Sequence, residues 1–399
     1  MKRIGVTFQG GDPAQPSTWS GTPYGVVTGL RAAGVEPVAI RIGPPPQLRG
    51  LARNAVAVPY LRPGRNWREA VQRARAAAAV SPLISSLDST AASYTLRRLT
   101  ELDGIIQIGT GYTLRTRVPI VTYEDMTVQQ TKVFPYRGWD LLSERAYRSR
   151  VRRQHAVYEQ AVACCLTSQW AARSVIDDYG VPASKVHAVG VGCNHRAPES
   201  NEGKLQRDWS APRFLFVGID WERKNGAGVL EAFRSVKKVA PSATLDVVGR
   251  HPPLHEAGVT PHGVLRLDDP VEIERLSRLF SEATCFVMPS YTEAFGIAYV
   301  EAAAAGIPSI GTVSGGSEFL IGDGGLVIDP YDFQALVSAM LRLCDPRTAA
   351  RMGAAAKERS AMFTWPAVAE RLLRALDGEP ADQPSAIPGD TRFAAKTSH

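Results

Sequence analysis

The sequence predicts an α/β protein with two successive domains, and three observations carry this prediction. The chain has 399 residues, which is enough for two or three domains with a substantial core. Near its start an apolar strand, Arg3–Phe8, precedes a loop with glycines and a helix over Tyr24–Ala33, which Gly34 ends. The same order of strand, loop and helix begins again at Arg213–Gly218. Such repeats are typical of parallel sheets covered by helices.

Composition places the chain among ordinary globular proteins. The apolar fraction of 44% is that of a water-soluble core-forming chain, and no apolar run is long enough to cross a bilayer. The chain enters its first strand at once without a secretory signal, so we expect a cytoplasmic protein. The cysteines show neither a C-x-x-C pair nor disulfide spacing, and we expect small core residues: Cys164, Cys165, Cys193, Cys285 and Cys344.

The net charge of +7 favours anionic ligands or surfaces without selecting one of them. The sequence has no zinc-ligand spacing, no Walker A lysine and no RNA-binding aromatic motif. We therefore expect no metal, no cofactor and no nucleic-acid partner.

Further elements follow from local patterns. Strands are expected at Pro37–Ile42, Gly104–Gly109, Pro119–Tyr123 and Val264–Arg266. A helix is expected over Asn66–Ala79, and Pro44-Pro45-Pro46 is expected to form a stiff loop.

The most informative stretch is Pro289–Ala302. An apolar run, Cys285–Met288, predicts a buried strand before it, and Gly296 permits a tight turn and close approach of a ligand. A helix over Ile297–Ala305 would then point free N–H groups at whatever lies above the loop, which is a phosphate site. Glu293 and Glu301 would repel phosphates, so we expect them to bind hydroxyls of a sugar and of a ribose.

The spacing of Glu293 and Glu301 resembles the E-x7-E signature of the retaining glycosyltransferases of family 4, which have the GT-B fold of two facing Rossmann-like domains. Ser290, the Phe295-Gly296 pair and the Ala-Gly-Ile-Pro helix ending strengthen the resemblance. It implies that Glu293 contacts the transferred sugar and Glu301 the ribose. The alternative is a helix with two solvated glutamates.

The loop after Arg213–Gly218 carries two adjacent cations, Arg223 and Lys224. The resemblance implies that they clamp the donor diphosphate, Arg as a fork and Lys as a point charge. Ile219 stands where the family more often has the arginine, so the two cations match a variant of the pattern. The alternative is a pair of solvated surface charges.

The remaining donor contacts are expected from the loop Ser20-Gly21-Thr22, in which Gly21 approaches the phosphate, from Arg250, and from the backbone at Phe295, Gly296 and Ile297. An ordinary capped helix explains the Gly21 loop equally well. The turn Gly315-Gly316-Ser317-Glu318 resembles the family's glycine-glycine-x-glutamate turn.

The acceptor side is expected at Glu124-Asp125, at the carboxyl end of a strand in the first half. Glu124 occupies the place where the family usually has a histidine, which predicts an uncharged or amino-bearing acceptor such as a sugar or small metabolite. A basic helix from Arg145 to Arg153 is either a solvated face or a patch for an anionic acceptor or membrane; membrane association is the less favoured alternative.

The expected domains are residues 1–195 on the acceptor side, residues 196–360 for the nucleotide sugar, a helix over 361–376 that crosses back to the first domain, and a disordered tail over 377–399. The linker is expected at 197–211. The expected activity is metal-independent, retaining transfer of a sugar from a nucleotide-diphosphate sugar, UDP-linked by preference, with Glu293, Arg223 and Lys224 as catalytic residues. The rivals are a sugar-nucleotide epimerase or phosphorylase, and a silent nucleotide-sugar-binding partner subunit.

Overall fold

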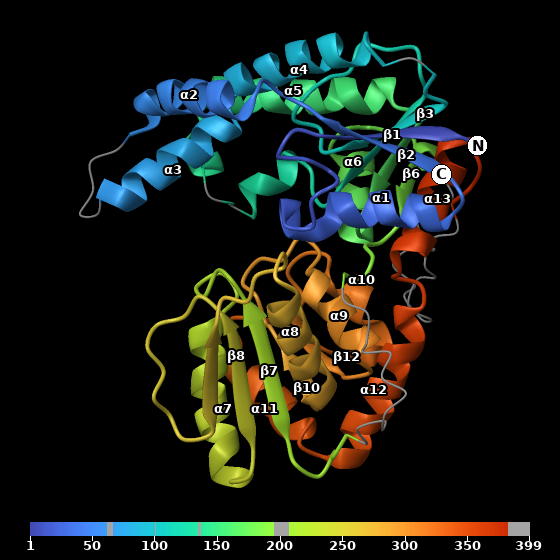
Figure 1. Ribbon diagram of the computed structural model, residues 1–399. Helices are drawn as coiled ribbons and strands as arrows, with labels where there is room; N and C mark the ends of the chain where they lie inside the picture. Colours follow the sequence, from blue (N-terminus) through green and yellow to red (C-terminus); the bar gives the residue numbers. More distant parts are fainter. Residues whose placement is uncertain (62–66, 100, 135, 137, 195–206, 382–399) are drawn as a thin grey trace. The chain divides into compact units, whose positions relative to one another are not determined.

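The computed structural model describes residues 1–61, 67–99, 101–134, 136, 138–194 and 207–381. Within them the chain divides into two compact units (Figure 1). The first comprises residues 1–167, 171–189 and 369–381, and the second comprises residues 168–170 and 190–368. The expected linker lies largely outside the described residues, as does the expected tail beyond residue 381.

The first unit contains a sheet of six parallel strands in the order β2-β1-β3-β4-β5-β6. Because β1 pairs with both β2 and β3, the strand order reverses between β1 and β3. The strands are β1 (Arg3–Phe8), β2 (Glu36–Arg41), β3 (Gly104–Ile108), β4 (Ile120–Glu124), β5 (Ala163–Leu166) and β6 (Val186–Ala188).

Helices cover both faces of this sheet, with α4 and α5 on one face and α1 on the other (Figure 1). Strands β3, β4 and β5 are buried throughout, as expected for central parallel strands. The helices are α1 (Thr22–Ala32), α2 (Pro46–Ala57), α3 (Trp67–Ala79), α4 (Pro82–Leu96), α5 (Glu144–Gln160) and α6 (Gln169–Asp177).

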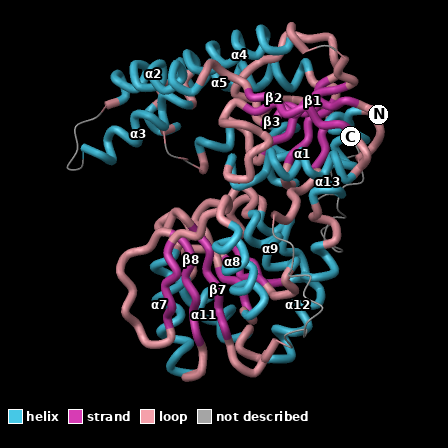
Figure 2. Tube along the Cα trace, in the orientation of Figure 1, coloured by secondary structure: helices cyan, strands magenta, loops and turns pink. Residues whose placement is uncertain are grey.

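The second unit repeats this architecture with a parallel sheet in the order β12-β11-β10-β7-β8-β9. Figure 2 shows strands of this sheet, among them β7 and β8, with the helices of the unit around them. The strand order reverses between β7 and β10, since β7 pairs with β10 on one side and with β8 on the other. The strands are β7 (Arg213–Gly218), β8 (Thr244–Gly249), β9 (Val259–Gly263), β10 (Cys285–Val287), β11 (Ser309–Thr312) and β12 (Gly325–Ile328).

The helices of the second unit connect these strands. They are α7 (Gly226–Val239), α8 (Pro270–Glu282), α9 (Ile297–Ala304), α10 (Ser317–Ile321), α11 (Phe333–Arg342) and α12 (Pro346–Ser360). The last helix, α13 (Trp365–Leu376), begins in the second unit, and its residues from Ala369 onward belong to the first.

Several local expectations need correction. The strand expected at Val264–Arg266 is wrong, because the chain instead forms β9 at Val259–Gly263 beside β8. Pro261 lies in β9. Proline has no backbone N–H to donate, and β9 tolerates this because it is an edge strand. The expected stiff loop at Pro44-Pro45-Pro46 ends one residue earlier, since Pro46 is the first residue of α2.

The basic helix α5 is only partly a solvated face. Arg150 is buried and donates to Val80 O at 3.2 Å and to the Ser85 hydroxyl. Arg153 donates to two serine hydroxyls of α4 at 3.0 Å. These two arginines therefore fasten α5 to α4, while Arg148 remains on the surface in a pair with Glu144.

Candidate active site in the second unit

The candidate site lies at the carboxyl ends of β7 and β10, where the strand order reverses. In open parallel sheets this crevice is where ligands bind. The loop after β7 supplies Arg223 and Lys224, and the loop after β10 supplies Ser290 and Glu293. Pairing of β7 with β10 brings the two loops together, and Tyr291 N donates to Arg223 O at 2.9 Å.

Glu293 is the centre of this cluster. Its Oε2 accepts from Lys224 Nζ in a short contact, from Ser290 Oγ at 3.1 Å and from Arg223 Nη1 at 3.4 Å. Arg223 Nη1 also donates to Thr292 O at 2.6 Å. The Glu293 side chain is only 6% exposed, so this is a buried carboxylate held by two cations.

The electrostatics of the cluster favour an ionised Glu293. Burial raises the pKa of its carboxyl, but Lys224 and Arg223 outweigh burial and hold that pKa below its ordinary value. Burial lowers the pKa of Lys224, and the neighbouring Glu293 opposes this shift. Both cations donate to Glu293, so the cluster places cationic N–H donors that suit an anionic ligand at the end of the sheet.

Backbone contacts fix the position of Glu293. Its N–H donates to Ser314 O at 3.2 Å, and its carbonyl accepts from Gly316 N at 3.0 Å. A Cβ on Gly315, which has φ of +107°, would lie 1.9 Å from Glu293 O. Glycine is therefore required in the expected Gly315–Glu318 turn, because the turn packs against the backbone of the loop that carries Glu293.

Helix starts flank the cluster on both sides. Asn225, directly after Lys224, has φ of +58° and caps α7 by accepting from Gly228 N at 3.2 Å. Its Nδ2 donates to Pro330 O at 3.2 Å. On the other side Gly296 is left-handed, and α9 begins at Ile297, so its free N–H groups face the end of the sheet.

The other expected donor residues lie in different places. Phe295 is buried in the same loop as Glu293, and Glu301 is buried within α9. Arg250 follows β8 and is exposed. Gly21 belongs to the first unit, where it follows Trp19 and Ser20 in three consecutive left-handed residues before α1. The Thr22 hydroxyl beside it is buried and, within the described part of the chain, has no hydrogen-bond partner.

Glu124 lies at the carboxyl end of β4 in the first unit, where it is buried in a polar network. It accepts from Thr110 Oγ1 at 2.8 Å, from Gln154 Nε2 at 3.3 Å and from the Tyr158 hydroxyl. Burial raises the pKa of Glu124 to about 7, although these donors oppose the shift. Asp125 beside it is half-buried.

Sequence reasoning missed the role of two residues in the candidate site. Ser290 was expected only as part of the motif, but its hydroxyl donates a hydrogen bond to the Glu293 carboxylate. Asn225 was not among the expected site residues, although it caps α7 and joins the Lys224 loop to Pro330. Two signals in the sequence were available. Ser290 places a hydroxyl three residues before Glu293, and Asn225 is a residue type that tolerates left-handed backbone.

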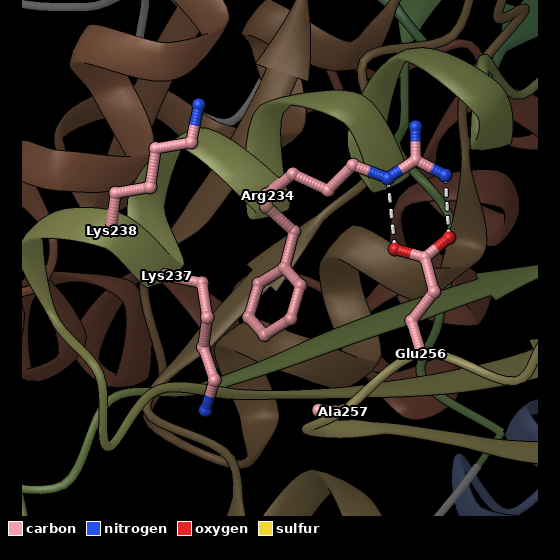
Figure 3. Close-up of a pocket in the computed structure, with 6 residues that line it drawn as sticks. Arg234, Lys237, Lys238, Glu256 and Ala257 are labelled. Atoms are coloured by element: carbon pink, nitrogen blue, oxygen red, sulfur yellow. Dashed lines mark hydrogen bonds and ion pairs between the residues drawn. The ribbon is translucent and has the colours of Figure 1, made fainter.

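A separate cavity of about 240 Å³ lies on the second unit between α7 and the loop before β9 (Figure 3). On one side Arg234 forms a bidentate ion pair with Glu256, in which Nε lies 2.9 Å from Oε2. The lining residues are Phe233, Arg234, Lys237, Lys238, Glu256 and Ala257. None of the expected site residues lines this cavity.

The described residues contain neither a membrane-spanning helix nor a cluster of metal ligands. No helix there is both long and apolar enough to cross a membrane. No group of three or more His, Cys, Asp or Glu side chains in that part of the chain is placed to hold a metal ion.

Known structures identify the fold. The sucrose-phosphate synthase of Thermosynechococcus elongatus superimposes with a TM-score of 0.60 over 94% of this chain and 98% of that chain, at 20% identity. WaaG, a glycosyltransferase involved in lipopolysaccharide biosynthesis, superimposes with a TM-score of 0.62 over 94% of this chain and 100% of that chain, at 16% identity. The protein has the GT-B fold.

The sequence comparisons concern the second unit above all. Residues 211–345 match the family described as glycosyl transferases group 1, so this segment is a group 1 glycosyltransferase domain. A D-inositol 3-phosphate glycosyltransferase of Streptomyces griseus is 34% identical over 139 residues, which are 34% of this chain and 28% of that protein. The match thus spans little more than a quarter of the relative's length.

Proposed function

We propose that the protein is a retaining glycosyltransferase that moves a sugar from a nucleotide-diphosphate sugar, UDP-linked by preference, to a hydroxyl of a small molecule or glycan. The observation that carries the proposal is the buried cluster of Glu293, Lys224 and Arg223 at the strand reversal of a group 1 glycosyltransferase domain. The named relatives that transfer sugars support the same class.

Chemistry explains why this cluster suits glycosyl transfer. The leaving diphosphate gains negative charge as the bond to the sugar breaks, and Lys224, Arg223 and the N–H groups at the start of α9 can stabilise it. These groups supply the positive charge that a metal supplies elsewhere, so we propose a metal-independent reaction. The Glu293 carboxylate then positions the sugar and faces its developing positive charge.

Glu301 is proposed to bind the ribose, from its place in α9 eight residues after Glu293. The Gly21 loop is proposed to approach the donor phosphate, and its run of left-handed residues supports this, since strained backbone often accompanies a ligand site. Arg250 is proposed as a further donor contact.

On the acceptor side we propose that Asp125 and Glu124 help to bind an uncharged or amino-bearing acceptor. Glu124 is held by three side chains, so its contribution is to order the end of β4, and half-buried Asp125 is the better placed for contact. Asp125→Asn and Glu124→Gln should each reduce transfer while leaving donor affinity unchanged in calorimetry. Normal transfer by both variants would contradict this assignment.

The test of the donor site uses the purified full chain with a panel of nucleotide-diphosphate sugars and candidate acceptors. Product formation is followed by mass spectrometry, and the anomeric configuration by NMR. Glu293→Gln should lower kcat, because its contact strengthens in the transition state, whereas Glu301→Ala should mainly raise the KM of the donor. Glu358→Gln, an exposed change on α12, is the matched control.

Each rival predicts a different result in this assay. An epimerase would change the donor without an acceptor, and a phosphorylase would need phosphate. A silent partner subunit would bind the donor in calorimetry and turn over none of it. Inversion of the anomeric centre would contradict retention while leaving the donor site intact.

A further inference from the structure

The outer helices of the first unit expose apolar side chains in two stripes. On α4, Leu83, Leu87 and Tyr94 recur at helical spacing, and on α2 and the turn after it Leu48, Leu51 and Val58 do the same. Their exposure ranges from 45% for Leu87 to 66% for Leu51. Leucines this exposed, in two stripes, are not the scattered apolar residues of an ordinary surface.

The two stripes lie on neighbouring helices that are locked in place. Arg49 of α2 forms an ion pair with buried Asp88 of α4 at 2.8 Å, and Figure 1 shows both helices in the outer layer of the unit. The opposite side of α4 is already occupied, because Ala92 and Leu96 belong to the hydrophobic core. The leucines therefore cannot turn inward without breaking existing contacts.

Positive charge surrounds the stripes. The described residues 46–61 and 67–98 contain seven arginines but only two acidic residues. Arg53 on α2 and Arg97 and Arg98 after α4 are exposed beside the stripes. Within the described residues, no carboxylate forms an ion pair with any of these three, and Arg98 donates to the hydroxyl of Tyr94 in the α4 stripe.

We infer that this surface, formed by α2 and α4, docks on an anionic lipid bilayer. Leucines would enter the boundary between head groups and acyl chains, Tyr94 would lie at the head-group level, and the arginines would pair with lipid phosphates. A second copy of the chain fits less well, because a two-fold contact would bring one arginine-rich face against another. The inference does not depend on the proposed function.

The surface differs from the one that the sequence indicated. The basic helix α5 was the expected candidate, but Arg150 and Arg153 point into the unit and bind α4. They support the lipid-facing helix from beneath and leave the contact itself to α2 and α4.

The test is co-sedimentation of the full chain with vesicles. The protein should sediment with vesicles of equal parts phosphatidylcholine and phosphatidylglycerol. At least tenfold less protein should sediment with pure phosphatidylcholine vesicles, and added salt should weaken binding to the anionic vesicles. Leu51→Ser with Leu87→Ser should reduce partitioning by on the order of tenfold or more. Arg53→Gln with Arg97→Gln should weaken binding to anionic vesicles only.

Matched controls come from exposed residues of the second unit. Val239→Ser with Val271→Ser removes apolar side chains of similar exposure, and Arg351→Gln removes an exposed cation, and both should leave binding unchanged. Failure of the wild type to pellet with anionic vesicles, or equal pelleting of the leucine variant, would overturn the inference. So would a dimer in sedimentation velocity that the leucine changes abolish, since it would make a second copy the occupant.

Discussion

At the scale of single residues, the pairing of Lys224 with Glu293 links the stability of the second unit to the proposed donor site. Lys224→Met leaves the buried Glu293 carboxylate with Arg223 and the Ser290 hydroxyl as its side-chain donors, which should cost roughly 3 kcal/mol of unfolding free energy. It should also weaken donor binding by about 1.5–3 kcal/mol. Denaturant titration and calorimetry measure the two effects separately.

The pH dependence provides the control for Lys224→Met. Glu293 has a depressed pKa in the folded protein, so the stability it contributes is present above its ordinary pKa and is lost as pH falls through the folded value. The variant and the wild type should therefore converge in stability at acidic pH. Lys224→Met with Glu293→Met should recover much of the loss at neutral pH; an undiminished loss in the double variant would show that the ion pair is not its cause.

Glu124 should titrate in the opposite sense. Its pKa is raised to about 7 from 4.5, so its favourable contribution is complete below pH 4.5 and is lost as pH rises through 7. Glu124→Gln should remove this slope and stabilise the protein above pH 7 by up to about 3 kcal/mol. Denaturant titration at a series of pH values measures this dependence of the unfolding free energy on pH, with Glu144→Gln at an exposed position as the control. A slope unchanged by Glu124→Gln would assign the titration to another group, such as Asp88.

At the scale of elements, the Gly315 turn contacts the backbone of the loop that carries Glu293. Gly315→Ala should lower the free energy of unfolding by the strain of a left-handed alanine and by roughly 2 kcal/mol more, because the new Cβ meets Glu293 O. It should also lower turnover by about a hundredfold, through displacement of Glu293. Unfolding and steady-state kinetics measure the two effects.

Gly306 provides the matched control for this change. It has φ of +71° like other left-handed glycines, yet a Cβ there would meet nothing closer than Lys357 Cβ at 3.7 Å. Gly306→Ala should therefore show the backbone strain alone, on the order of 1 kcal/mol, with normal turnover. Equal behaviour of the two variants would show that contact with Gly315 does not position Glu293.

At the scale of the whole molecule, the last helix stabilises the first unit from the far end of the chain. Leu372 and Leu376 of α13 are buried, and a Cβ on Gly104 of β3 would lie 2.3 Å from Leu376. Arg371 donates to Val189 O at 2.8 Å. Leu376→Ala should destabilise the unit by about 2–5 kcal/mol through the cavity it leaves.

Hydrogen exchange can localise this effect. Protection of amides in β1 and β3 should fall in Leu376→Ala, while protection in β7 and β8 should remain. Exposed Glu370→Ala on the same helix should change neither. A loss confined to α13 itself would mean that the helix adds no stability to the sheet.

Much of the candidate site could be predicted from local sequence because its parts are short strand–loop–helix units. The strand over 285–287, the glycine at 296 and the helix from Ile297 follow from an apolar run, a turn residue and helix formers within a dozen positions. The resemblance of the Glu293 and Glu301 spacing to family 4 indicated the GT-B fold, which the known structures confirm.

The tertiary structure alone decided which groups meet. Lys224 and Glu293 are 69 residues apart, and only the pairing of β7 with β10 joins them into one ion pair. Likewise, periodicity could not reveal that Arg150 and Arg153 point inward, because their serine partners lie on another helix. Patterns in sequence record what neighbours along the chain require, whereas burial and charge pairing depend on residues that only the folded sheet brings together.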